Sequence, residues 1–161
     1  MQLSSAQKQT ISNLLDEELV MAKSMYGLLE REYEALTDGD PEVITATSKK
    51  KLEQLHEMEQ HLAQGNLFLL ELGLTADTRG AEQAIAMTGP DQTLQSKWDE
   101  LRSMEIKLQR QNEINGGIIT IGQRRVKQAL DILSGKAGLT GTYSQEGEAK
   151  FSKSNGLHTK A

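Results

Sequence analysis

Apolar residues recur along this chain in alternating steps of four and three, which is the spacing of an amphipathic helix. The first stretch carries two neighbouring rows of this kind, one from residue 15 to residue 36 and one from residue 11 to residue 28, the second broken by Glu18. Such a wide stripe is typical of a bundle helix rather than of a two-stranded coiled coil. Gly39 predicts the end of this helix, and Asp40 and Pro41 predict the start of the next.

The pattern also predicts the remaining helices. The second is marked by Ile44, Leu52, Leu55, Met58, Leu62, Leu69 and Leu72, with Gly73 as its C-cap. Between residues 74 and 90 the periodicity lapses, which indicates a longer connection. Within it a short helix is expected around 81–87, followed by a capping box at 88–91. From residue 94 to residue 133 the step continues without a slip, which predicts one helix on the order of 60 Å long at 1.5 Å per residue. Ser134 and Gly135 predict its end.

These patterns predict an all-α fold, an antiparallel bundle of three long helices plus a short connecting helix over residues 1–134. Apolar residues make up 37% of the chain and aromatic residues 4%, which suits a long thin bundle. Residues 135–161 differ in kind, because five glycines and no helical periodicity predict an irregular, flexible tail. Four lysines and two glutamates give this tail a net charge of +2, so the −5 of the whole chain leaves −7 for the body.

Composition excludes several classes of function. The net charge of −5 disfavours nucleic-acid binding, and the absence of cysteine excludes disulfides and thiolate metal sites. The first 15 residues lack the pattern of a signal peptide, and the longest apolar stretch, residues 67–74, is far too short for stable membrane insertion. A protein of the cytoplasm is therefore expected.

Two histidines resemble a metal site and three consecutive lysines resemble a basic binding patch, but their spacing disfavours both. His56 and His61 are five residues apart, which does not place both imidazoles on one helix face, so a solvated surface without metal is predicted. Residues 49–51, three lysines, likewise predict a solvated face. No nucleophile motif or phosphate-binding loop occurs, so neither an enzyme nor a cofactor is expected.

The long last helix contains an unusual polar and glycine-rich stretch, comprising Asn112, Asn115, Gly116 and Gly117. Two interpretations are open: a notch where another helix packs closely, or a hinge that lets residues 118–134 move semi-independently. The segment that follows spreads its apolar residues over more than one helix face, whereas packing in one bundle seam requires only one apolar face. These residues are Ile118, Ile119, Ile121, Val126, Leu130 and Leu133, and they are the predicted binding residues for a partner.

The C-terminal third carries a series of short motifs in a fixed order within residues 94–147. These are Asn112, Asn115–Gly116, an apolar run ending at Leu133, Gly135, and then Tyr143 with Gly147. By their order, this region resembles the FlgN-type flagellar export chaperones. The resemblance implies binding of the C-terminal amphipathic helices of hook–filament junction proteins, which keeps these clients unassembled until export. It further implies docking to the cytoplasmic domain of the export gate protein FlhA, with Tyr143 as the docking residue and Leu139 as its apolar neighbour.

Two other functions remain open on the sequence. A structural coiled-coil adaptor acting through self-association predicts a stable homo-oligomer that does not need the tail. A helical-bundle enzyme or metal protein predicts bound metal on purification.

Overall fold

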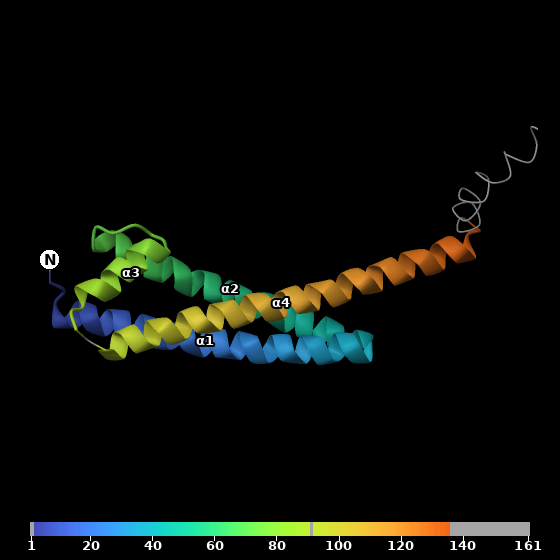
Figure 1. Cartoon of the computed structure of the whole chain (residues 1–161), viewed down its shortest axis with the longest axis horizontal. Coiled ribbons are helices and arrows are strands. Elements are labelled where there is room, and N and C mark those ends of the chain that lie inside the picture. Colours follow the sequence, from blue (N-terminus) through green and yellow to red (C-terminus); the bar gives the residue numbers. More distant parts are fainter. Residues whose placement is uncertain (1, 91, 136–161) are drawn as a thin grey trace, which may run out of the picture. The chain divides into compact units, whose positions relative to one another are not determined.

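The structure is a computed structural model that describes residues 2–90 and 92–135. These residues form four helices and no strands, namely α1 (Ser5–Asp38), α2 (Pro41–Glu71), α3 (Thr78–Met87) and α4 (Gln92–Leu133) (Figure 1). The predicted all-α fold of three long helices and a short connecting helix is confirmed. The chain divides into two units, residues 1–116 and 117–161. The predicted irregular tail lies outside the described residues except for Gly135.

The turn between α1 and α2 forms as its sequence predicts. Gly39 adopts the left-handed conformation, at φ 72°, and its N–H donates to the Ala35 carbonyl. The Asp40 carboxylate then accepts hydrogen bonds from the backbone N–H groups of Glu42 and Val43. Pro41 occupies the first turn of α2, where a missing N–H leaves no bond unmade.

The C-terminus of α2 is also followed by a glycine in the left-handed conformation, as its sequence predicts. Gly73 is left-handed at φ 75°, directly after the C-cap residue Leu72. The Gly73 N–H donates to Leu70 and the Leu74 N–H to Leu69, both over 2.9 Å. This pair of bonds is the Schellman arrangement, which satisfies the last carbonyls of the helix.

The connection between α2 and α4 differs from its prediction in two details. Helix α3 begins three residues earlier than expected, because the Asp77 carboxylate caps it by accepting from the Gly80 N–H over 2.8 Å. The predicted capping box at 88–91 is wrong for Thr88. This residue ends α3 and its hydroxyl donates to the Ile85 carbonyl, whereas α4 begins only at Gln92. Asp91 lies outside the described residues.

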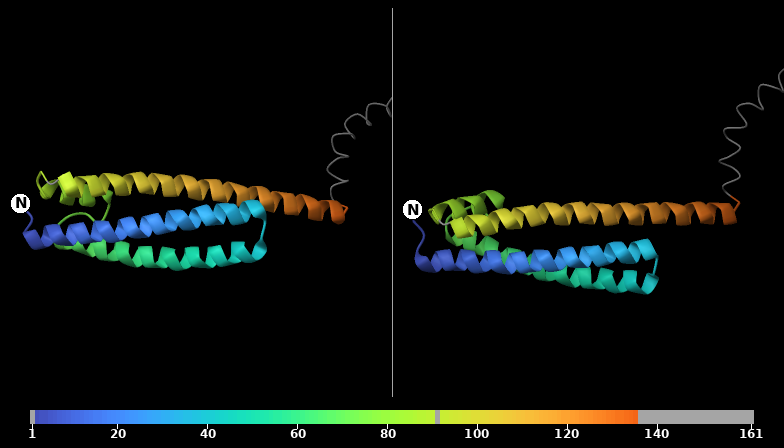
Figure 2. Two further views of the ribbon diagram at one scale, coloured as in Figure 1. Left: turned by 90° about the horizontal axis from the view of Figure 1, so that it is seen from below. Right: turned by 60° about the horizontal axis from the view of Figure 1, so that its bottom comes forward.

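In the first unit, α1 and α2 lie side by side and run in opposite directions (Figure 2). Their side-chain contacts confirm this, since His61 reaches the Leu14 carbonyl near one end of α1 and Lys51 reaches Glu32 further along it. The part of α4 up to residue 116 runs parallel to α1. Lys97 of α4 bonds Asp16 near the start of α1 and Asn115 bonds Leu29 further along it.

The core of this unit forms around α1. Both predicted rows of α1 contribute buried side chains, which confirms its assignment as a bundle helix. Leu94 and Leu101 of α4 and Ala84 and Ile85 of α3 pack on the first part of α1. A second, smaller cluster of Met25, Leu28 and Leu29 lies towards its other end.

Helix α2 is oriented differently from what its leucines suggest. The row that faces the bundle steps through Thr47, Lys51, Gln54, Met58 and His61, all buried or half-buried, and only Met58 among them is apolar. Leu52, Leu55 and Leu62 are exposed. The prediction of a solvated surface is therefore wrong for His61 and Lys51, because neighbouring helices cover both side chains.

Candidate functional site

A buried polar cluster joins three helices at the asparagine motif of α4. Asn115 is only 1% exposed, and its Nδ2 donates to the Leu29 carbonyl over 2.9 Å and to Glu32 Oε2 over 2.7 Å. Lys51 Nζ donates to the same Glu32 oxygen over 3.2 Å and to Asn112 Oδ1 over 2.8 Å. Both asparagines of the motif thus bind partners on α1 or α2.

This cluster holds the three helices in one register. Glu32 is 5% exposed, so its charge requires the partners that Lys51 and Asn115 provide. A one-turn slip of α4 would leave the Asn115 Nδ2 buried without its hydrogen bonds and would leave Glu32 with Lys51 but without Asn115. The sequence indicated that the asparagines were unusual, but the lysine and glutamate that meet them lie 61 and 83 residues away along the chain.

The glycine pair follows directly after the buried asparagine. A Cβ added at Gly116 or Gly117 would meet no atom within 4 Å among the described residues outside the adjoining helix backbone. Close packing of a neighbour therefore does not explain these two glycines. The division of the chain into two units falls between them.

The second unit, of which residues 117–135 are described, is helical as far as Leu133. It holds all six predicted binding residues. Ile118 is half-exposed, and Ile119, Ile121, Val126, Leu130 and Leu133 are exposed, with Leu133 at 83%. Ile132 is a further exposed apolar residue on this helix that the prediction omitted, although its sequence position already places it beside the others.

Ordinary helix geometry gathers these apolar side chains on one broad side. At 100° per residue they span about half of the helix circumference. Arg124 and Lys127 lie on the other half, and Arg125 interrupts the apolar half between Ile132 and Ile118. A helix with this distribution can cover the apolar face of another amphipathic helix.

Two predicted docking residues cannot be placed in the structure. Leu139 and Tyr143 lie outside the described residues. The sequence therefore remains the only basis for their assignment.

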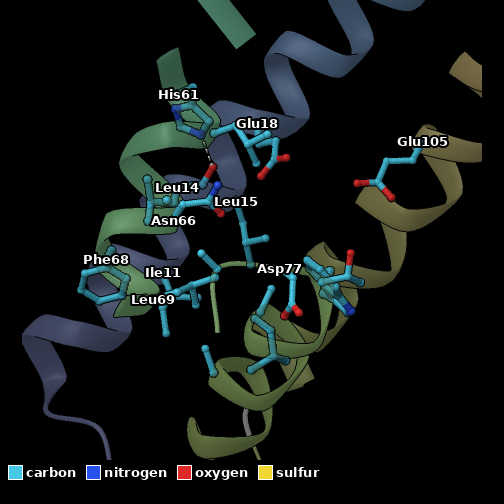
Figure 3. Close-up of a pocket in the computed structure, with 18 residues that line it drawn as sticks. Ile11, Leu14, Leu15, Glu18, His61, Asn66, Phe68, Leu69, Asp77 and Glu105 are labelled. Carbon is cyan, nitrogen blue, oxygen red and sulfur yellow. Dashed lines mark hydrogen bonds between the residues drawn. The ribbon is translucent and has the colours of Figure 1, made fainter. Parts of the chain in front are cut away.

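A separate pocket of about 340 Å³ opens in the first unit (Figure 3). Its walls are mostly apolar, from α1, α2, α3 and α4, with Glu18, His61, Asp77 and Glu105 as ionisable members. Burial raises the pKa of the Glu18 carboxyl; the nearby His61 opposes this rise and Glu105 adds to it. The pKa of Asp77 is lowered by its hydrogen bonds from Thr75 and Gly80.

Neither histidine of α2 belongs to a group of potential metal ligands among the described residues. His61 Nε2 contacts the Leu14 carbonyl over 3.1 Å, and its Nδ1 lies 3.4 Å from Glu17 Oε2. His56 is exposed and bonds Gln60 on its own helix. Within the described ranges, no three histidine, aspartate or glutamate side chains converge as metal ligands.

None of the four described helices combines the length and the apolarity that a membrane crossing requires. The comparisons with curated proteins and with solved structures gave no match. Residues 1–150, however, match the family described as FlgN protein. The match extends over α1 and α2, beyond the C-terminal motifs that carry the resemblance in the sequence. The chain therefore belongs to the FlgN family, a family of flagellar export chaperones rather than of enzymes.

Proposed function

We propose that this chaperone binds the C-terminal amphipathic helices of hook–filament junction proteins in the cytoplasm. The binding residues are Ile118, Ile119, Ile121, Val126, Leu130 and Leu133, with Ile132 added to the predicted set. The exposure of these side chains on a well-formed helix is the observation that carries the proposal. Isolated exposed apolar residues are common, but six of them, with the half-exposed Ile118 beside them, within 16 residues of one helix indicate a surface for a partner.

The client chemistry follows from the same surface. A helix that polymerises through an apolar face self-associates unless that face is covered. Pairing it with residues 118–133 buries both apolar faces and leaves the backbone hydrogen bonds of both helices intact. Isoleucine and leucine contacts without buried polar partners also tolerate different client sequences.

Residues 135–161 complete the proposed cycle as the docking segment. Leu139 and Tyr143 are assigned to the cytoplasmic domain of FlhA through the family resemblance. Gly116 and Gly117 act as the hinge, because each lowers helix stability by about 1 kcal/mol relative to alanine without a close contact that requires glycine.

Calorimetry tests the client site. The full chain and a version ending at Ser134 are titrated with a peptide of the C-terminal helix of a hook–filament junction protein. Saturable one-to-one binding to both is expected, because the proposed client residues precede the truncation. Loss of binding on truncation would assign the client to residues 135–161 and contradict the proposal.

A matched pair of variants separates the apolar side from general effects on the helix. Val126→Asp/Leu130→Asp is expected to lower the affinity for the peptide at least ten-fold. Gln123→Asp/Gln128→Asp adds the same charge to exposed positions of the same helix and is expected to bind like the parent. If no version binds peptide and the parent is a stable homo-oligomer, a self-associating adaptor is the better function.

A further inference from the structure

Helix α2 carries an apolar stripe that the bundle leaves open. Leu55, Leu62 and Leu69 recur every seven residues, which places them on one face of the helix over about 21 Å. Leu55 and Leu62 are exposed, Leu62 at 54%, and Leu69 is half-buried. Leu62 and Leu69 also line the pocket of the first unit, so the stripe runs out of the pocket along α2.

Carboxylates flank this pocket. Glu18 of α1 and Glu105 of α4 lie on opposite sides of it (Figure 3). Glu105 pairs with Arg102 of its own helix, whereas Glu18 has no hydrogen-bond or ion-pair partner among the described residues. No lysine or arginine lines the pocket, and its three carboxylates, Glu18, Asp77 and Glu105, outnumber its one histidine, His61, so the lining favours a cation.

The shape of the surface identifies the kind of occupant. The pocket, at about 340 Å³, is too small for a helix of 10–12 Å diameter, but it accepts apolar side chains that project from one. A small molecule would fill the pocket and leave Leu55 uncovered. A helix laid along α2 covers the whole stripe and satisfies its own backbone hydrogen bonds.

We infer that the stripe and its pocket bind an amphipathic helix of a partner protein whose apolar row is flanked by lysine or arginine. Apolar side chains of that helix enter the pocket beside Leu62 and Leu69, and its cations meet Glu18 and Glu105. The inference rests on the proposed function only in taking this helix as a second segment of the same client. The surface itself consists of residues other than 118–133.

Trp98 provides a site-specific signal, because it is the only tryptophan of the chain and it lines the pocket. The full chain is titrated with an 18-residue helical peptide that has leucine at heptad spacing, lysine beside the leucine row, and no tryptophan or tyrosine. A saturable change in Trp98 emission is expected, weakened by added salt. The same peptide with glutamate in place of lysine is expected to bind at least ten-fold more weakly. Equal binding of both peptides would overturn the inference.

Variants locate the contact. Glu18→Gln/Glu105→Gln is expected to remove most of the preference for the lysine peptide, and Glu30→Gln/Glu34→Gln, at exposed positions elsewhere on the first unit, is expected to keep it. Leu62→Ser is expected to lower the affinity for the lysine peptide at least five-fold, with calorimetry as a second readout. Unchanged affinity in both Glu18→Gln/Glu105→Gln and Leu62→Ser would contradict the inference.

Val126→Asp/Leu130→Asp separates this inference from the proposed function. It is expected to leave the Trp98 response to the lysine peptide unchanged while it weakens binding of the junction-protein peptide at residues 118–133 at least ten-fold. If calorimetry detects the lysine peptide but Trp98 does not respond, the peptide binds elsewhere and the inference is wrong. A Trp98 change that depends on protein concentration without peptide would identify a second copy as the occupant and also overturn it.

Discussion

The two parts of α4 on either side of the glycine pair share one pattern and differ in environment. Between residues 94 and 115 the row that steps by four and three is buried at Leu94, Leu101 and Asn115. Beyond Gly117 the same row continues through residues 119, 122, 126, 129 and 133, all of them exposed. One continuous helix therefore uses the same periodicity first for a core and then for an exposed surface.

The comparison shows that amphipathic spacing predicts which side chains become buried, but not which surface covers them. Apolar side chains leave water with the same gain whether the covering surface belongs to the same chain or to a partner. The polar cluster at Asn115 marks the change, since it is the last buried position of α4. The predictions below test this boundary, from the largest expected effect to the smallest.

Core and exposed leucines should differ strongly in their contribution to stability. Leu101 is 1% exposed, so Leu101→Ala is expected to lower the free energy of unfolding by about 2–5 kcal/mol. Leu130→Ala, at an exposed position, should change it by less than about 0.5 kcal/mol. Urea denaturation measures both. A loss at Leu130 as large as that at Leu101 would mean that residues 118–133 are packed in the free protein.

The polar cluster should stabilise the boundary mainly through its buried asparagine. Asn115→Ala leaves Glu32 and the Leu29 carbonyl with one partner fewer inside the bundle, and a loss of about 2 kcal/mol is expected. Asn112→Ala removes one bond to Lys51 at an exposed position and should cost less than about 1 kcal/mol. Thermal unfolding compares them, and equal losses would contradict a specific role for the buried residue.

The glycine pair should be replaceable without a clash. Each of Gly116→Ala and Gly117→Ala is expected to stabilise the helix by about 1 kcal/mol, because alanine restricts the unfolded chain and its Cβ meets open space. Slower amide hydrogen exchange across residues 113–121 would show this directly. Reduced client affinity in the double variant would support the hinge, whereas unchanged affinity would remove it from the mechanism.

Glu18 should give the smallest effect, and one that depends on pH. Because burial raises its pKa above the ordinary 4.5, the folded protein holds this proton more tightly than the unfolded chain does. The resulting stability is complete below pH 4.5 and is lost as the pH rises through the raised pKa. Glu18→Gln stays neutral throughout and is therefore expected to be more stable than the parent at pH 7. The advantage should vanish below pH 4.5, and urea titrations at the two pH values measure it.

Helix α2 shows where prediction from sequence fails. Its leucines marked a helix correctly, but its bundle-facing row contains Lys51, Gln54 and His61, which sequence reasoning assigns to solvent. Their partners explain the difference. Lys51 meets Glu32, Gln54 Nε2 donates to Ser24 Oγ, and His61 meets the Leu14 carbonyl, all on α1. Such pairings between distant positions leave no periodic signal in a single sequence.

The sequence by itself determined the helices, most of their ends and the family, because periodicity, caps and short motifs are local properties of the chain. It also indicated that the residues beyond Gly117 include more apolar side chains than packing against one bundle seam requires. Only the tertiary structure decided which apolar rows are buried, since burial depends on the neighbour that each helix face meets. The same rule applies to Leu62 and Asn115. The leucine is open because the bundle covers another face of α2, and the asparagine is buried because a carboxylate on α1 lies opposite it.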